Sequence, residues 1–339
     1  EPLAAHPANP QNLYLRRSVH RGGIFDSSGE VIAESLEGSS GFQRVYRGTP
    51  GLAPTIGYSS QRYGTAGVEK SFDRILMGQQ YPGGSLIGRI RSMLADRTSG
   101  YDLITTIDLP LQESVERAFA GRKGAAVVIE VKTGRILAIA SLPGFIPTDK
   151  ESKWSAILAD TDSPLYNRAL AGFYPPGSTF KLVVLAAGLA SGAVDLESSF
   201  LDLGKISVEG HQIGNAGNRA WGEISLLDAL VISSNVVFVE IAQEIGSDDL
   251  LQMARSFGLG QRPPLVGGDA AAGKLPVGQL SPVQLAEMAI GQYGLVTTPL
   301  QMAVVVQTIA NDGLMMQPLL IDGVKASGDH RLWTNRPQL

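Results

Sequence analysis

The sequence contains no cysteine, so disulfides, thiolate catalysis and cysteine-ligated metal sites are all excluded. It has only 4 histidines, His6, His20, His211 and His330, and no two of them have the short helical spacing of a zinc site. The sequence therefore favours neither metal catalysis nor a Ser-His-Asp triad. We expect a protein that uses no metal and no cofactor.

Long apolar runs and a strong charge bias are missing as well. No run of about 18 apolar residues occurs, so no membrane-spanning segment is expected within the chain. The chain begins at Glu1 with no signal peptide, and we expect a mature or engineered fragment whose natural anchor has been removed. The net charge is only -4 at pH 7 and the basic residues are scattered, which argues against a basic groove for nucleic acid.

What remains is a chain of 339 residues, 44% of them hydrophobic, which is enough for about two domains with a sizeable core. Residues 1–104 are rich in glycine and polar residues. Short strand-like segments alternate there with turn sequences such as Ser27-Ser28-Gly29, Gly38–Gly41 and Tyr81–Gly84. We predict an extended, β-rich first domain over residues 1–104, with a boundary near residues 97–105.

The second part of the chain, residues 105–339, has a different texture. Gly124–Val131 and Arg135–Leu142 are apolar and joined by Lys132-Thr133-Gly134, so we predict a β-hairpin. Apolar residues at helical spacing predict a helix at Leu109–Arg117, and Ser178–Leu189 is apolar almost all round, which predicts a buried helix. Further helices are predicted at Ile224–Ile245 (two helices with a loop), Leu280–Tyr293 and Leu300–Asn311. A hairpin combined with a group of helices predicts an α+β fold.

One candidate for chemistry is the serine that follows two prolines in the segment Tyr174–Lys181. Prolines are excluded from helix interiors, so the helix begins after them and Ser178 lies near its first turn. Lys181 follows three residues later, on the same face. A serine hydroxyl needs a base, and a lysine in the apolar surroundings that follow can be that base if burial lowers its pKa. The alternative is a capping serine and a surface lysine, because Ser-x-x-Lys occurs about once by chance in a chain of this length.

A second candidate is the turn Ser233-Ser234-Asn235, which holds the only Ser-x-Asn of the chain. It lies between two apolar helical stretches, where a polar turn can face a cleft. A hydroxyl from Ser233 could relay protons, and the amide of Asn235 could bind a peptide group. The alternative is a helix cap, since serine and asparagine both favour that position.

The two motifs together resemble the signature of acyl-serine transferases, Ser-x-x-Lys followed by Ser-x-Asn. Their separation and the surrounding sequence are similar to those of class B penicillin-binding proteins, and the segment Tyr58–Gly78 resembles their PbpA-like subgroup. The likeness extends from about residue 12 to residue 320. Further matching segments are Arg21–Gly29, Tyr101–Leu109, Gly124–Leu142, Asn167–Ala169 and Thr298–Ala303.

The resemblance implies a pedestal domain over residues 1–104 and a transpeptidase domain over residues 105–339, with helices on an antiparallel sheet. It implies a peptidoglycan D,D-transpeptidase in which Ser178 attacks D-Ala–D-Ala stem peptides and Lys181 is the general base. Ser233 would then assist proton delivery to the leaving group, and Asn235 would hold the donor peptide. β-Lactams would acylate Ser178.

The resemblance also implies a location and partners. The protein would be anchored by an N-terminal segment at the extracytoplasmic face of the cell membrane. There it would act in cell division or cell shape, with a polytopic glycosyltransferase as its partner.

The third motif of the family, Lys-Thr/Ser-Gly, has no match after Asn235. The match at Lys132-Thr133-Gly134 precedes Ser178, and we predict that it is only the turn of the hairpin. We therefore expect the true motif beyond Leu339, in a part of the transpeptidase domain that this chain lacks.

Two alternatives to an active transpeptidase stay open. The missing third motif is compatible with a non-catalytic relative that acts as a cell-wall scaffold. Ser178–Lys181 reads Ser-Thr-Phe-Lys, which also resembles class D β-lactamases and β-lactam sensors.

Overall fold

The computed structural model describes residues 19–38, 41–60, 62–80, 99–147, 151–326 and 331–339. The chain forms two compact units, which are described separately below. The first comprises Glu1–Ala171, Pro264–Ala270 and Ala310–Leu339, and the second comprises Gly172–Pro263 and Ala271–Ile309.

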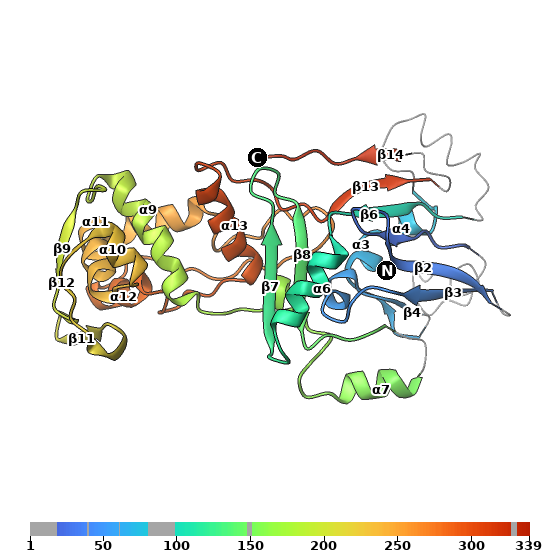
Figure 1. Cartoon of the computed structure of the whole chain (residues 1–339), viewed down its shortest axis with the longest axis horizontal. Coiled ribbons are helices and arrows are strands. Elements are labelled where there is room, and N and C mark those ends of the chain that lie inside the picture. The colour runs from blue at the N-terminus through green and yellow to red at the C-terminus, as the bar shows by residue number, and fades with distance from the viewer. Residues whose placement is uncertain (1–18, 39–40, 61, 81–98, 148–150, 327–330) are drawn as a thin grey trace. The chain divides into compact units, whose positions relative to one another are not determined.

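A six-stranded sheet organises the first unit, with the strand order β14-β13-β6-β1-β2-β3 (Figure 1). The pair β1–β6 is parallel and the other pairs are antiparallel. The strands are β1 (Ile24–Phe25), β2 (Val31–Gly38), β3 (Gly41–Tyr46), β6 (Asp102–Thr105), β13 (Ile321–Lys325) and β14 (Arg331–Thr334).

The described rest of the segment before residue 104 consists of short strands, as the turn-rich sequence predicted, and of short helices that it did not predict. The predicted turn at Ser27-Ser28-Gly29 forms, since Asp26 Oδ1 accepts from the Ser28 and Glu30 amides at 2.8 Å each. The turn predicted at Tyr81–Gly84 lies outside the described residues. The short elements are α2 (Ala53–Ile56), β4 (Ser59–Ser60), β5 (Gly64–Thr65), α3 (Gly67–Ser71) and α4 (Asp73–Leu76).

The six-stranded sheet combines strands from distant parts of the chain. Strand β6, at residues 102–105, lies between β1 from the N-terminal part and β13 from the C-terminal part. The predicted domain boundary between residues 104 and 105 stays a prediction.

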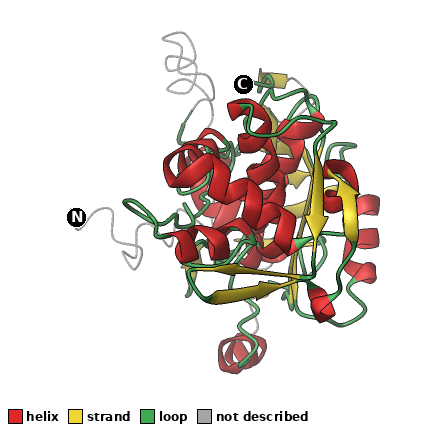
Figure 2. Ribbon diagram, turned by 90° about the vertical axis from the view of Figure 1, so that its left-hand side faces the viewer, coloured by secondary structure: helices red, strands yellow, loops and turns green. Residues whose placement is uncertain are grey.

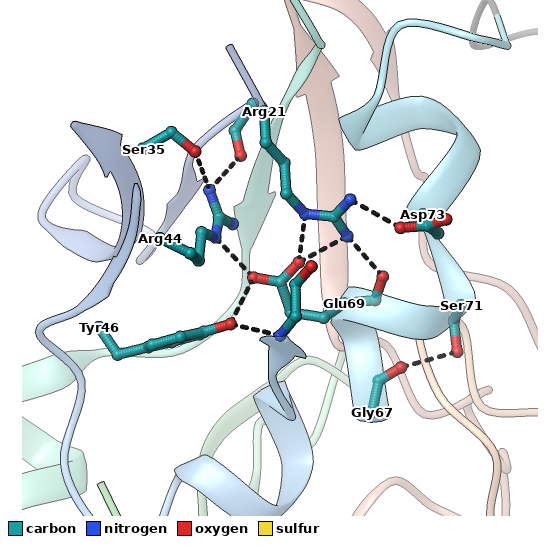
Figure 3. Close-up of polar contacts among 10 residues, drawn as sticks. Arg21, Ser35, Arg44, Tyr46, Gly67, Glu69, Ser71 and Asp73 are labelled. Carbon is teal, nitrogen blue, oxygen red and sulfur yellow. Dashed lines mark hydrogen bonds and ion pairs between the residues drawn. The ribbon is translucent and has the colours of Figure 1, made fainter. Parts of the chain in front are cut away.

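A buried ion-pair cluster joins helix α3 to this sheet (Figure 3). The Glu69 carboxylate is fully buried and accepts hydrogen bonds of 2.7 Å from both Arg21 Nε and Arg44 Nε. Arg21 also bonds Asp73 at 2.6 Å, and Tyr46 donates to Glu69 at 3.2 Å. Burial alone would raise the pKa of Glu69, but the two guanidinium groups outweigh it and hold that pKa below its usual value. The ion pairs of this cluster therefore hold α3 against the sheet, and each buried charge is stabilised by its oppositely charged neighbours.

The predicted hairpin is confirmed as β7 (Gly124–Ile129) paired antiparallel with β8 (Ile136–Leu142). Helix α6 (Leu109–Ala118) lies against β8, where the Gln112 side chain bonds the backbone of Ile139 in both directions. Lys132-Thr133-Gly134 is the turn, as predicted. Gly134 has φ 73°, and a Cβ there would lie 2.4 Å from the Gln317 carbonyl oxygen, so only glycine fits.

Two short helices complete the first unit. They are α7 (Glu151–Ala159) and α8 (Arg168–Ala171). Trp154 of α7 is buried against the rings of Tyr58, Tyr63 and Phe145, in a small apolar cluster of its own.

Packed helices form the core of the second unit (Figure 2). Helix α9 packs along α11, and Gly188 permits the close approach because a Cβ there would lie 2.9 Å from Ile241. Short strand pairs, β9–β12 and β10–β11, border the helices. The helices are α9 (Lys181–Ser191), α10 (Leu226–Val231), α11 (Asn235–Ser256), α12 (Pro282–Ala289) and α13 (Pro299–Ala310). The strands are β9 (Ser199–Asp202), β10 (Lys205–Val208), β11 (His211–Gly214) and β12 (Gly222–Ser225).

The helix predictions for this unit are confirmed with two corrections at their starts. Ile224 and Ser225 belong to β12, so the helix predicted from Ile224 begins at Leu226. The helix predicted from Ser178 begins instead as a single 3-10 turn, η2 (Gly177–Phe180), and the α-helix proper starts at Lys181. Gly177 has φ 57°, outside the helical range, so the chain enters the helix through a tighter turn. The α+β fold class is confirmed. None of the helices in the described ranges is long and apolar enough to cross a bilayer.

Candidate active site

The predicted nucleophile, Ser178, is exposed on the one-turn helix η2. A backbone contact holds this turn, because Gly177 N donates to the Gly291 carbonyl oxygen at 3.1 Å. Gly291 has φ 75°, and a Cβ there would lie 2.0 Å from the Gly177 oxygen. Glycine at position 291 therefore lets two backbone segments meet directly behind the nucleophile.

Two further contacts anchor the nucleophile turn within the second unit. Tyr174 pairs with Thr297 through reciprocal backbone hydrogen bonds of 3.0 and 2.9 Å. On the other side of Ser178, the ring of Phe180 is fully buried in the helical core. The serine thus stands on a segment fixed at both ends, as a nucleophile requires if it is to meet a substrate in one orientation.

Lys181 is buried in the same core, with 1% of its surface exposed. Its Nζ atom donates to three acceptors of the Ser233–Asn235 turn. They are the Ser233 carbonyl oxygen at 2.7 Å, Ser233 Oγ at 3.0 Å and Asn235 Oδ1 at 2.7 Å. The structure therefore brings three of the four predicted site residues together.

Burial lowers the pKa of Lys181 to about 8, because desolvation disfavours the ammonium form. None of its three acceptors is a carboxylate, so no negative charge offsets that effect at hydrogen-bond distance. A lysine with this pKa is neutral in part of the molecules at neutral pH. It can therefore accept a proton, which an ordinary lysine does poorly.

The protonation state of Lys181 determines which hydrogen bonds its Nζ atom can donate and accept. An ammonium has three N–H groups, and three acceptors are present. A neutral amine has two N–H groups and one lone pair, and neither the Ser233 carbonyl nor Asn235 Oδ1 can donate to that lone pair. Only a hydroxyl can. Deprotonation of Lys181 thus directs its lone pair at Ser233 Oγ or at an incoming hydroxyl such as that of Ser178.

The two polar side chains of the turn have distinct constraints. Ser233 has φ 60°, in the left-handed region that a non-glycine residue adopts only at a cost. Asn235 uses Oδ1 for Lys181 and donates from Nδ2 to the Gly214 carbonyl at 2.8 Å. One N–H of that amide stays available to bind a ligand carbonyl.

Ser178 is not joined to this cluster by a side-chain hydrogen bond among the described residues; its contact with Lys181 is through the backbone, where Lys181 N donates to the Ser178 carbonyl. Catalytic hydrogen bonds are often long in a protein without its ligand. The sequence placed Ser178 and Lys181 one turn apart, and the structure keeps them on adjacent turns.

The residues behind this turn include two, Asp202 and Asn215, that the sequence did not predict. Three buried side chains behind the turn are joined by hydrogen bonds, those of Asp202, Asn215 and Ser234. The Oδ1 atom of Asn215 also accepts from the backbone N–H of Asn235 at 2.8 Å. An aspartate and an asparagine thirteen residues apart, on either side of a hairpin, carry no local pattern that would have identified them. Within the described ranges, no group of three or more metal-ligating side chains occurs.

Comparison with known families gives the class of this fold and site. Residues 124–338 match the penicillin binding protein transpeptidase domain, and residues 21–100 match the penicillin binding protein A dimerisation domain. The chain belongs to the penicillin-binding protein transpeptidase family.

Individual members of this family show which proteins the chain resembles. The chain is 34% identical to the peptidoglycan D,D-transpeptidase PbpA of Mycobacterium tuberculosis over 95% of its own length and 69% of the relative's. It is 33% identical to PbpA of Mycolicibacterium smegmatis, covering 99% and 72% of the two chains. The fold is similar to penicillin-binding protein A from M. tuberculosis, solved as a ceftriaxone acyl-enzyme complex. That match has a TM-score of 0.86 and 31% identity, and it covers 96% of this chain and 77% of the other.

Proposed function

We propose that this chain has the function of a serine-type peptidoglycan D,D-transpeptidase. Lys181 carries the proposal, because it is a buried amine with a pKa lowered to about 8 that is bound to Ser233 and Asn235. The D,D-transpeptidase activity of the PbpA relatives and the acyl-enzyme form of the similar structure support the same reaction.

The reaction has two transfers. Ser178 Oγ attacks the carbonyl between the two D-alanines of a stem peptide while neutral Lys181 takes its proton. The carbon–nitrogen bond breaks, and the departing D-Ala amine receives a proton relayed through the Ser233 hydroxyl. The amine of a second stem peptide then attacks the acyl-serine ester, which forms the cross-link and frees Ser178. Asn235 donates its remaining Nδ2 hydrogen to a carbonyl of the donor peptide.

The same nucleophile explains β-lactam binding. A β-lactam has a strained amide that Ser178 opens, and the acyl group stays on the serine because the leaving amine remains attached. The assignment of Ser178, Lys181, Ser233 and Asn235 to these roles is part of the proposal.

The proposal extends to organisation and location. Residues 1–104 form a pedestal domain and residues 105–339 a transpeptidase domain. The enzyme works at the extracytoplasmic face of the cell membrane through an N-terminal anchor, with a polytopic glycosyltransferase that supplies the glycan strands. These assignments rest on the family resemblance.

Covalent labelling tests the proposal. The full-length protein is incubated with a labelled penicillin, and the adduct is located by mass spectrometry of its peptides. We expect one adduct on Ser178 that is absent from Ser178→Ala. A full-length protein with no adduct would favour a non-catalytic scaffold. An adduct that persists in Ser178→Ala would exclude Ser178 as the nucleophile.

The β-lactamase alternative is separated by turnover. A transpeptidase releases the opened β-lactam slowly, so nitrocefin should give one burst equivalent to the enzyme concentration. Steady hydrolysis over many turnovers would instead favour the class D-like interpretation.

A further inference from the structure

A buried carboxylate lies behind the turn that holds Lys181. Asp202, at the end of β9, is fully buried. Its oxygens accept from Gly204 N at 2.8 Å, from Asn215 Nδ2 at 2.8 Å each and from Ser234 Oγ at 2.6 Å. All three donors are neutral, and no cation pairs with Asp202 among the described residues. A buried carboxyl group has to be satisfied by hydrogen bonds, and here all of them come from neutral groups of the turn and the hairpin.

Asn215 connects this carboxylate to the start of helix α11. Its Nδ2 faces Asp202, so its Oδ1 faces away and accepts from Asn235 N at 2.8 Å and Val236 N at 3.3 Å. The orientation of the amide is thereby determined, since a flipped amide would point its oxygen at the carboxylate. The Asn215 side chain thus accepts hydrogen bonds from two backbone N–H groups in the first turn of α11, the helix that begins at Asn235.

Ser234 is the second connection. It is the residue between Ser233 and Asn235, and it is the N-cap of α11, where its Oγ accepts from Val237 N at 3.1 Å. Because that hydroxyl donates its only proton to Asp202 at 2.6 Å, its lone pairs are left facing the helix. Asp202 therefore orients the cap, and the cap fixes the backbone from which the flanking side chains reach Lys181.

This arrangement also explains the unusual backbone of Ser233. A serine with φ 60° persists only where its surroundings hold it. Ser234 on one side is anchored by Asp202, so the left-handed residue directs both its carbonyl and its hydroxyl at Lys181 Nζ. A relaxed Ser233 would turn at least one of these groups away.

We infer that Asp202 and Asn215 are positioning residues of the acylation site, acting through Ser234 and Asn235 on the groups that surround Lys181. The inference rests on the proposed function, since it assigns these residues a part in the acylation of Ser178. It requires that their loss slows acylation in molecules that are still folded.

The test measures acylation of the full-length protein by a fluorescent penicillin. Stopped-flow or quench experiments over a range of penicillin concentrations give the maximal acylation rate, the half-saturating concentration and the fraction of protein labelled. The variants are Asp202→Asn, Ser234→Ala and the double variant. The control is Glu223→Gln, which makes the same carboxylate-to-amide change at an exposed position of β12, the strand paired with β9.

We expect Asp202→Asn to lower the maximal rate at least tenfold while most of the protein is still labelled, with Glu223→Gln unchanged. Ser234→Ala, which breaks only the second of the two connections, should lower the rate by no more than Asp202→Asn does, and the double variant should show no loss beyond that of Asp202→Asn, because Ser234 acts through its bond to Asp202. A merely structural role would lower the melting temperature and the labelled fraction but leave the rate of the folded molecules unchanged. That result would overturn the inference.

The remaining outcomes are also decisive. If Asp202→Asn does not fold, Ser234→Ala decides alone, and a wild-type rate in that variant refutes the inference. If the wild-type protein itself is not labelled, the proposed function fails, which is a distinct result.

Discussion

The Nζ atom of Lys181 donates a hydrogen bond of 2.7 Å to the Oδ1 atom of Asn235, although the residues are 54 positions apart in the sequence. This bond links the first helix after the nucleophile to the start of α11. It holds the amine without a neighbouring carboxylate, so burial dominates the pKa of Lys181.

The first prediction concerns the pH dependence of acylation. Lys181 acts as a base only when neutral, and its pKa of about 8 leaves roughly a tenth of the molecules neutral at pH 7. The second-order rate constant for penicillin acylation should rise about tenfold per pH unit below 7.5 and level off above about 8.5. Lys181→Met should abolish this rise and reduce acylation by about a thousandfold. A flat profile in the wild-type protein would contradict the role of Lys181 as the base.

The second prediction is that a charge beside Lys181 shifts this profile. In Asn235→Asp, a carboxylate takes the place of an amide oxygen 2.7 Å from Nζ and stabilises the ammonium. The pKa of Lys181 should rise, and the limb of the acylation profile should move to higher pH by one unit or more. The control is Gln252→Glu, which adds the same charge at an exposed position of α11 and should leave the profile in place. An unshifted limb in Asn235→Asp would mean that another group controls the pH dependence.

The third prediction concerns the glycine behind the nucleophile turn. In Gly291→Ala, the new Cβ would lie 2.0 Å from the Gly177 oxygen, so the turn that carries Ser178 must move. We expect a loss of about 3 kcal/mol or more in unfolding free energy and a large loss of acylation rate. Gly210→Ala is the control, because Gly210 has φ 85° but nothing within 4 Å of its Cβ position.

The control variant isolates the effect of close approach. Gly210→Ala should cost about 1 kcal/mol from backbone strain alone and leave the acylation rate unchanged. Denaturant unfolding and penicillin labelling measure both effects. Equal losses in the two variants would show that backbone strain, and not the contact with Gly177, limits position 291.

The fourth prediction concerns the buried ion-pair cluster. Glu69→Gln leaves the buried Arg44 guanidinium without an acidic partner among the described residues, and Arg21 with only Asp73 as its counter-charge. We expect a loss of about 3–5 kcal/mol in unfolding free energy. The matched control is Glu113→Gln, whose exposed pair with Arg117 at 3.4 Å should contribute less than about 1 kcal/mol. Denaturant titration of both variants measures the difference, and a cost for Glu69→Gln as small as that of the control would contradict this account.

The same cluster also predicts how the stability of the protein changes at acid pH. The pKa of Glu69 is lower in the folded protein than its ordinary value. Its contribution to stability is therefore present above about pH 4.5 and is lost as the pH falls through the folded pKa. The wild-type protein should lose this increment on acidification, whereas Glu69→Gln should not.

Much of the fold was accessible from local patterns. The hairpin of β7 and β8 was predicted because two apolar segments flank a glycine turn, and the helices of the second unit were predicted because their apolar residues have helical spacing. The start of the nucleophile helix was wrong by one turn. Sequence periodicity does not distinguish a 3-10 turn from an α-helix over four residues, and the contact of Gly177 with Gly291 is not local.

The residues of the candidate site also fall into two groups, those that a local sequence pattern identified and those that it did not. Ser178 and Lys181 could be found because their spacing has a chemical meaning, and Ser233 and Asn235 because the tripeptide is unique in the chain. Asp202 and Asn215 could not be found. Their significance depends on a strand end, a hairpin and a helix N-terminus meeting at one buried point.

The sequence by itself determined the two motifs, the hairpin turn and the apolar faces of the helices, because each depends on residues close together in the chain. The resemblance to the penicillin-binding proteins arises from the same local segments. Tertiary structure alone decided the protonation chemistry of Lys181. Its lowered pKa comes from burial between α9 and α11, and its three acceptors come from a turn more than fifty residues away. Desolvation and hydrogen bonding are properties of the packed molecule, so no spacing in the sequence could have supplied them.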